Sequence, residues 1–116
     1  MMQRGDIVWV DLEPVRGNEA NKRRPAVIVS NDGANRTATR LRRGVVTIVP
    51  VTTNTSRIYP FQVLLPGDRC DLAGDSKAQA EQIRSVAAER VGDTVGHVPS
   101  DVLAELDDAI RLHLAL

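Results

Sequence analysis

Most apolar residues of this chain stand in short runs that are rich in valine and isoleucine and end at proline, glycine or polar residues. Such runs are typical of β-strands, because branched side chains suit an extended backbone. No run is long enough to cross a membrane as a helix. The pattern predicts strands over 6–12, 25–30, 45–52 and 61–65, and one or two more between residues 76 and 86.

The C-terminal segment has a different period. From Val102 to Leu114, apolar side chains recur at spacings of three and four, which predicts an amphipathic helix. Ser100 is a candidate N-cap for this helix. A chain of 116 residues supports one core, so we expect a single domain over 1–116. The predicted fold is mostly β: a small barrel-like sheet closed by a C-terminal α-helix.

The connections between the predicted strands are polar. Residues 13–24 predict a long loop that contains proline and glycine. Asn31 and Asp32 can cap a short helical turn, and residues 36–43 predict a basic connection.

Composition makes several classes of protein unlikely. Only three aromatic residues occur, too few for a stacking platform of the kind that many single-strand binders use. His97, His113 and Cys70 lack the spacing of a metal site, so no metal or other cofactor is predicted. A lone cysteine forms no internal disulfide, and no apolar stretch follows the basic start as in a signal peptide. We expect a cytoplasmic protein without a membrane segment.

The net charge of zero conceals two unequal halves. Residues 1–58 contain ten basic and five acidic residues, a net charge of +5, so residues 59–116 carry −5. A basic half can hold a polyanion locally, although two complementary solvated halves would give the same count.

Two places carry hydrogen-bond donors suited to a phosphate. In Lys22-Arg23-Arg24-Pro25, the proline favours an extended backbone at Arg24, whose guanidinium can bind a phosphate through two donors. The second place is 50–56, where a predicted strand ends in small polar side chains. Taken alone, each place also fits an ordinary polar loop.

Read together, these places belong to a longer pattern that runs in order through most of the chain. Its segments are RGDIVWVDL (4–12), GNE (17–19), RPAVIVS (24–30), VPVT (49–52), YPFQV (59–63) and EQIRS (81–85). The pattern resembles the MazF toxin family, the PemK/Kid-type endoribonucleases of bacterial toxin–antitoxin pairs. The resemblance implies an SH3-like (CcdB-type) barrel that forms a homodimer, with RNA in a groove across the dimer.

The resemblance also assigns roles to residues. The two main catalytic positions of the family fall on Arg24 and Thr52, and a first-loop glutamate linked to activity in some members falls on Glu19. The pair that lines the RNA groove falls on Glu81 and Gln82. Other residues expected to bind RNA are Asn21, Lys22, Arg23, Thr53 and Asn54.

The implied reaction needs no metal. The 2′-hydroxyl of single-stranded RNA attacks the adjacent phosphate and leaves a 2′,3′-cyclic phosphate and a 5′-hydroxyl. Arg24 and Thr52 would stabilise the developing charge, and Glu19 is a better base than an arginine. The implied protein partner is an antitoxin with an acidic, initially disordered tail. The alternatives are a CcdB-like toxin that binds gyrase without nuclease activity, and a barrel that only binds RNA.

Overall fold

The computed structural model describes residues 2–12 and 23–116. Within them the chain forms a seven-stranded antiparallel sheet and a C-terminal helix, as expected for the predicted mostly-β fold. None of the described helices is long and apolar enough to span a membrane. In chain order the elements are β1 (Asp6–Asp11), β2 (Arg23–Ile28), α1 (Asp32–Leu41), β3 (Val45–Thr52), β4 (Gln62–Leu65), α2 (Gly67–Cys70), β5 (Ser76–Gln79), η1 (Ala80–Gln82), β6 (Arg84–Ala87), η2 (Ala88–Arg90), β7 (Val91–His97) and α3 (Ser100–Leu114).

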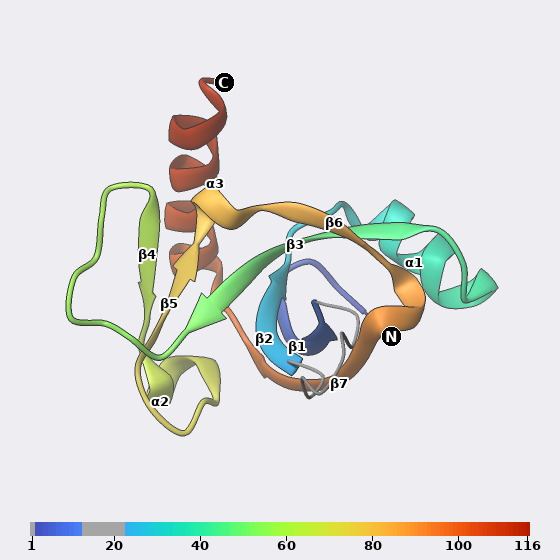
Figure 1. The fold of residues 1–116 in the computed structure, drawn as a ribbon, viewed down its shortest axis with the longest axis horizontal. Coiled ribbons are helices and arrows are strands. Elements are labelled where there is room, and N and C mark those ends of the chain that lie inside the picture. Colours follow the sequence, from blue (N-terminus) through green and yellow to red (C-terminus); the bar gives the residue numbers. More distant parts are fainter. Residues whose placement is uncertain (1, 13–22) are drawn as a thin grey trace, which may run out of the picture.

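The sheet is strongly curled and barrel-like, but it is not closed. Its strand order is β4-β5-β3-β2-β1-β7, and β6 pairs with β3 beside β5. Figure 1 shows β3, β2, β1, β7 and β6 curling around a common centre, with the α1 and α3 helices at opposite ends of the molecule. Among the described strands no hydrogen-bonded pairing joins β6 to β7. The two strands are connected only by the short η2 turn between them in the sequence.

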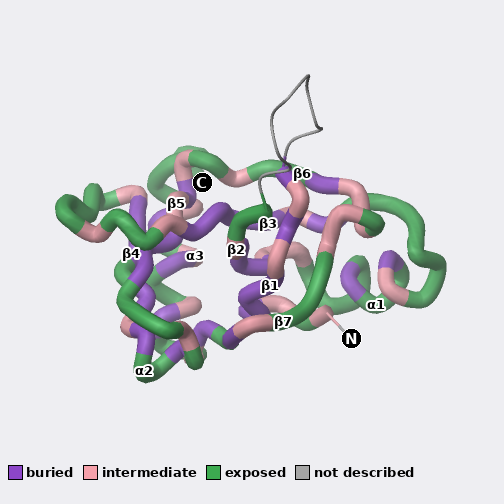
Figure 2. The backbone as a smooth tube through the Cα atoms, turned by 60° about the horizontal axis from the view of Figure 1, so that its bottom comes forward, coloured by how far each residue is buried: buried purple, intermediate pink, exposed green. Residues whose placement is uncertain are grey.

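Side chains that alternate along the central strands pack into two separate cores, one on each face of the sheet. One core lies between the sheet and α3 and includes Ile7, Val27, Val49 and Leu106. The other core fills the inside of the curl, with Val8, Ala26 and Ile48 among its members. Figure 2 shows that the buried residues concentrate in the central strands, whereas much of β7 and of the loops is exposed. β1, β2 and β3 are therefore buried on both faces and form the rigid part of the fold.

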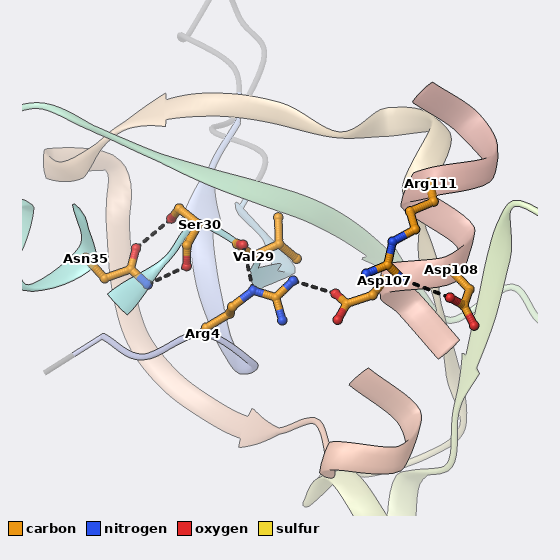
Figure 3. Close-up of polar contacts among 7 residues, drawn as sticks. All are labelled: Arg4, Val29, Ser30, Asn35, Asp107, Asp108 and Arg111. Atoms are coloured by element: carbon orange, nitrogen blue, oxygen red, sulfur yellow. Dashed lines mark hydrogen bonds and ion pairs between the residues drawn. The ribbon is translucent and has the colours of Figure 1, made fainter. Parts of the chain in front are cut away.

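Helix α3 is fixed to the start of the chain by Arg4. The Arg4 Nε donates to the carbonyl oxygen of Val29 at 2.9 Å, and its Nη2 forms an ion pair with Asp107 on α3. Figure 3 shows Arg4 reaching between the end of β2 and the helix. The neighbouring Asp6 is buried, accepts from the Gln3 backbone N–H at 2.9 Å and lies 2.8 Å from the His97 Nδ1. The opening Arg-Gly-Asp sequence therefore connects the end of β2, strand β7 and the terminal helix.

Two predictions about the helices are wrong. Most residues predicted as a basic connection belong to α1, in which only Asn35 and Ala38 are buried. Asn31 caps that helix as expected, accepting from the Ala34 N–H at 2.8 Å. Ser100 is not the N-cap of α3: it is the first helical residue, and Pro99 occupies the cap without a side-chain hydrogen bond.

Two strands also differ from the prediction. The second strand begins earlier than expected, at Arg23, so Pro25 lies inside it. The proline is tolerated because the pairing of β2 with β3 begins one residue later, at Ala26. Strand β7 occupies a stretch for which the sequence pattern predicts no strand.

Candidate active site

The register of β2 and β3 relates the positions of Arg24 and Thr52. These antiparallel strands pair Ile28 with Ile48 and Ala26 with Pro50, where the ladder between them ends. Continued for two residues beyond this last pair, the same register would set Arg24 opposite Thr52. Because side chains alternate along a strand, both point to the face that carries Ala26. Two residues that are far apart in the sequence therefore share one end of one sheet face.

Both side chains are accessible there. Arg24 is exposed, and within residues 2–12 and 23–116 its guanidinium makes no hydrogen bond or ion pair. Thr52 is half-buried, and its Oγ1 accepts a long hydrogen bond of 3.3 Å from the Asn54 backbone N–H. A hydroxyl that accepts in this way still has its own proton to donate. The pair can thus present a cationic fork and a neutral donor to the same anion.

The chain after Thr52 forms a compact polar turn. Thr53 and Asn54 are exposed, as a residue that contacts a ligand must be. The Asn54 Oδ1 accepts from the Ser56 backbone N–H at 3.2 Å and from its hydroxyl at 2.8 Å. These bonds fix the carbonyl side of the Asn54 amide, and its NH₂ group donates no hydrogen bond among the described residues.

The predicted groove pair differs in accessibility. Glu81 in η1 is half-buried, and its Oε2 accepts from the Gln62 Nε2 at 2.7 Å. Its other oxygen is buried without a partner among the described residues. Gln82 is exposed. Glu81 therefore joins η1 to β4, whereas Gln82 is open to a ligand.

The first-loop residues separate into two groups. Glu19, Asn21 and Lys22 lie outside the described residues. Arg23 pairs with Asp11 in β1 and, by strand alternation, points to the opposite face from Arg24. Its Nη2 lies against Gly92 of β7, where a Cβ would be only 2.5 Å away. Arg23 therefore does not share a surface with Arg24 and Thr52.

The structure adds two cations that sequence reasoning missed. Lys77 on β5 is paired with Thr52, and Arg84 on β6 is paired with Ile48, so both belong to the same face as Arg24. Arg84 is exposed and Lys77 is buried. Weak alternation over 76–86 gives no sign of either position, because the sequence does not reveal which strand becomes the neighbour of β3.

The electrostatic features outside this face are structural. Burial raises the pKa of the Cys70 thiol, which is fully buried in the first core. The hydrogen bonds from Arg69 lower the pKa of Asp101 at the start of α3. Among the described residues no group of three or more His, Cys, Asp or Glu is placed to hold a metal ion.

A groove of about 590 Å³ lies away from the Arg24–Thr52 pair. Its lining comes from α1, η2 and β7 and includes Ala38, Arg42 and Val91. Neither Arg24 nor Thr52 lines it. The candidate site is therefore separate from this groove.

Two relatives match this chain over its whole length. Endoribonuclease MazF9 of Mycobacterium tuberculosis is 60% identical over 116 residues, covering 100% of this chain and 98% of the relative. Endoribonuclease EndoA of Bacillus subtilis is 28% identical, covering 100% of this chain and 97% of the relative.

Among solved structures, a MazE–MazF crystal form from Deinococcus radiodurans has a TM-score of 0.79 at 29% identity, with 99% and 96% of the two chains covered. A mycobacterial endoribonuclease in complex with its cognate antitoxin has a TM-score of 0.76 at 27% identity, with coverage of 100% and 97%. The family model described as PemK-like, MazF-like toxin of type II toxin–antitoxin systems matches residues 3–114. The chain belongs to this toxin family.

Proposed function

We propose that this toxin is a cytoplasmic endoribonuclease that cuts single-stranded RNA at specific sequences and thereby inhibits translation and growth. The observation that carries the proposal is the β2–β3 register, which, continued two residues beyond the Ala26–Pro50 pair, would set Arg24 opposite Thr52 on one face of the sheet. The names of the relatives, which are endoribonucleases, support it.

The chemistry uses the nucleophile of the substrate. The 2′-oxygen of the RNA forms a bond to phosphorus, and the bond from phosphorus to the 5′-oxygen breaks. The products are a 2′,3′-cyclic phosphate and a 5′-hydroxyl. Arg24 donates two N–H groups to the non-bridging oxygens and Thr52 donates its hydroxyl, so both stabilise the charge of the phosphorane. DNA lacks the 2′-hydroxyl and is not cut.

Two protons move in this reaction. The 2′-hydroxyl loses one and the departing 5′-oxygen gains one. An arginine is a poor base because its pKa is far above neutral and it stays protonated, so we assign the first proton to Glu19, which precedes β2 in the sequence. Glu19→Gln would then lower kcat without weakening the binding of RNA, measured with an oligonucleotide whose 2′-hydroxyl is replaced by hydrogen.

The residues around the pair would read the bases. Thr53 and Asn54 follow Thr52 and are exposed, as is Gln82, and Asn21, Lys22 and Glu81 belong to the same predicted RNA-binding set. Arg23, which points to the opposite face from Arg24, is left out of this role. Bases must be unstacked to reach such groups, which restricts cutting to single strands.

The deciding experiment is direct. Purified protein is incubated with single-stranded RNA in EDTA, and the cut ends are mapped. We expect cleavage with 2′,3′-cyclic phosphate ends, its loss in Arg24→Ala, and no cleavage of DNA of the same sequence. Intact RNA at micromolar protein would overturn the proposal and favour the gyrase-binding alternative. Binding without cleavage would favour a barrel that only holds RNA.

The protein partners would be a second copy and an antitoxin. Leu64 and Leu112 are exposed and line one groove of about 370 Å³ between β4 and α3, which suits a homodimer contact. Leu112→Glu would then yield a monomer in analytical ultracentrifugation. Co-expression with the cognate antitoxin is expected to abolish RNA cleavage, as its acidic tail competes with RNA for the basic surface.

A further inference from the structure

Lys77 is a buried cation without a carboxylate partner among the described residues. Only 7% of the residue is exposed, and none of the ion pairs in those residues includes it. It lies in β5 between two strands, opposite Thr52 on β3 and opposite Leu64 on β4. A buried ammonium is costly unless other groups replace its water, so its contacts show what stabilises it there.

Those contacts belong to the residues that follow Thr52. We call residues 53–61 the β3–β4 segment. The Lys77 Nζ donates to the backbone carbonyl oxygen of Arg57 at 2.7 Å, and it lies 5.9 Å from the centre of the Tyr59 ring. A charged donor on a backbone oxygen is among the stronger hydrogen bonds in proteins. Lys77 thus holds the middle of the segment by its main chain.

Aromatic contacts extend this hold toward the end of the segment. The Arg57 guanidinium carbon lies 4.6 Å from the centre of the Tyr59 ring. The Tyr59 ring stacks on Phe61, with centroids 5.3 Å apart and planes inclined by 3°. The Tyr59 ring therefore contacts two cations and a second ring, and the latter is next to the first residue of β4.

We propose that Lys77 is a positioning residue, which fixes the β3–β4 segment against β5 and so determines which bases the Thr53 and Asn54 side chains accept. This inference rests on the proposed RNA cleavage. Thr52 ends β3 and is paired with Lys77 on the adjacent strand, so the same lysine borders both the proposed Thr52 donor and the residues that would read the RNA. Without its hydrogen bond to Arg57, the segment would lose its fixed distance from the scissile phosphate.

The first test needs no RNA. Trypsin cuts after arginine, and the Arg57–Ile58 bond is held in place by the contact to Lys77. Lys77→Met keeps the length of the side chain but removes its charge and its donors. We expect it to accelerate cutting after Arg57 at least about fivefold, because local opening sets the rate of such cuts. Lys77→Arg, which keeps a donor, is expected to restore protection.

The second test measures selection of RNA. A pool of random single-stranded oligonucleotides is cut by the wild type, Lys77→Met, Lys77→Arg and Arg36→Met, and the ends are sequenced. Arg36 is an exposed cation on α1, so its variant controls for the loss of one charge. For the preferred sequence, we expect Lys77→Met to raise KM about tenfold, to leave kcat within about threefold and to broaden the sequences cut. The arginine variant should recover the wild-type pattern.

If Lys77→Met fails to fold, Tyr59→Leu is a second variant that weakens the packing of the β3–β4 segment against Lys77. It removes the ring that Arg57 and Lys77 share, and it should also raise KM and broaden the pattern. Folded variants with wild-type KM, wild-type cutting pattern and unchanged proteolysis would overturn the proposal. A fall in kcat alone would also overturn it, because that is the signature of a catalytic group. If the wild type cuts no RNA, the proposed function fails, whereas accelerated proteolysis of Lys77→Met would still support the positioning role.

Discussion

Arg4, near the N-terminus, forms an ion pair with Asp107 on the C-terminal helix, and both side chains are about two-thirds shielded from solvent, with exposed fractions of 31% and 28%. The same guanidinium donates to the backbone of Val29 at the end of β2. A shielded ion pair with a second hydrogen bond is worth more than an exposed pair, which contributes little. The first and last elements of the chain are thereby held to a common point.

Arg4→Met should lower the free energy of unfolding by about 1–3 kcal/mol, because it removes two charge-assisted hydrogen bonds and leaves Asp107 without a partner. Urea denaturation measures the change. Arg111→Met is the matched control, because Arg111 pairs with Asp108 on the open surface of the same helix, where the side chains are 60% and 78% exposed. An equal loss in both variants would contradict the role assigned to Arg4.

Thr52→Val should leave the fold intact and lower kcat about 100-fold, as expected when one donor to a developing oxyanion is lost. The change replaces the hydroxyl with a methyl group of similar size. Single-turnover cleavage measures the chemical step, and circular dichroism checks the fold. Thr47→Val on the same strand is the control, because Thr47 lies nearer the far end of β3 and pairs with Ser85 on β6. Wild-type cleavage by Thr52→Val would remove Thr52 from the mechanism.

Gly96→Ala should destabilise the fold by about 1–3 kcal/mol through overpacking. A Cβ at Gly96 would lie 2.2 Å from the backbone oxygen of Cys70, so β7 and α2 could not keep their present contact. Gly74→Ala is the matched control, since a Cβ there meets nothing within 4 Å. Thermal unfolding of both variants compares them directly. A similar melting temperature for the two would show that α2 can move aside at little cost.

Cys70 should resist thiol reagents in the native protein. Burial raises its pKa, so the thiol stays protonated, and reagents cannot reach it. Modification at pH 8 is expected only as fast as the protein opens, and rapidly in denaturant. Because the folded-state pKa is raised, the stabilising effect of the neutral buried thiol is complete below the unfolded-state pKa and declines as the pH rises above it. Rapid labelling of the folded protein would contradict this picture.

The elements that can be predicted from the sequence are those whose own residues show a clear apolar pattern. β1 and β3 are dense in valine and isoleucine, and α3 has apolar residues at helical spacing, so both kinds of element are predictable. α1 cannot be predicted in this way, because it buries only Asn35 and Ala38. β7 cannot be predicted either, because most of its residues are exposed glycine and polar side chains, and its pairing with β1 alone makes it a strand.

The candidate site divides in the same way. The proline after Arg24 and the polar end of β3 are local features, and they are enough to indicate hydrogen-bond donors at Arg24 and Thr52. Their relative placement depends on the β2–β3 register, which no single segment encodes. The position of Lys77 beside Thr52 is beyond prediction for the same reason, because it requires knowing that β5 lies on the other edge of β3.

The register of β2 and β3 is maintained by the backbone ladder, by side chains buried on both faces and, beyond the end of β2, by the hydrogen bonds of Val29 and Ser30 to Thr47. Among the described residues, no hydrogen bond joins the turn after Thr52 to β2. Insertions or exchanges in that turn would therefore leave the proposed catalytic pair in place, so evolution could retune such a toxin to new transcripts by altering only the edge of the sheet.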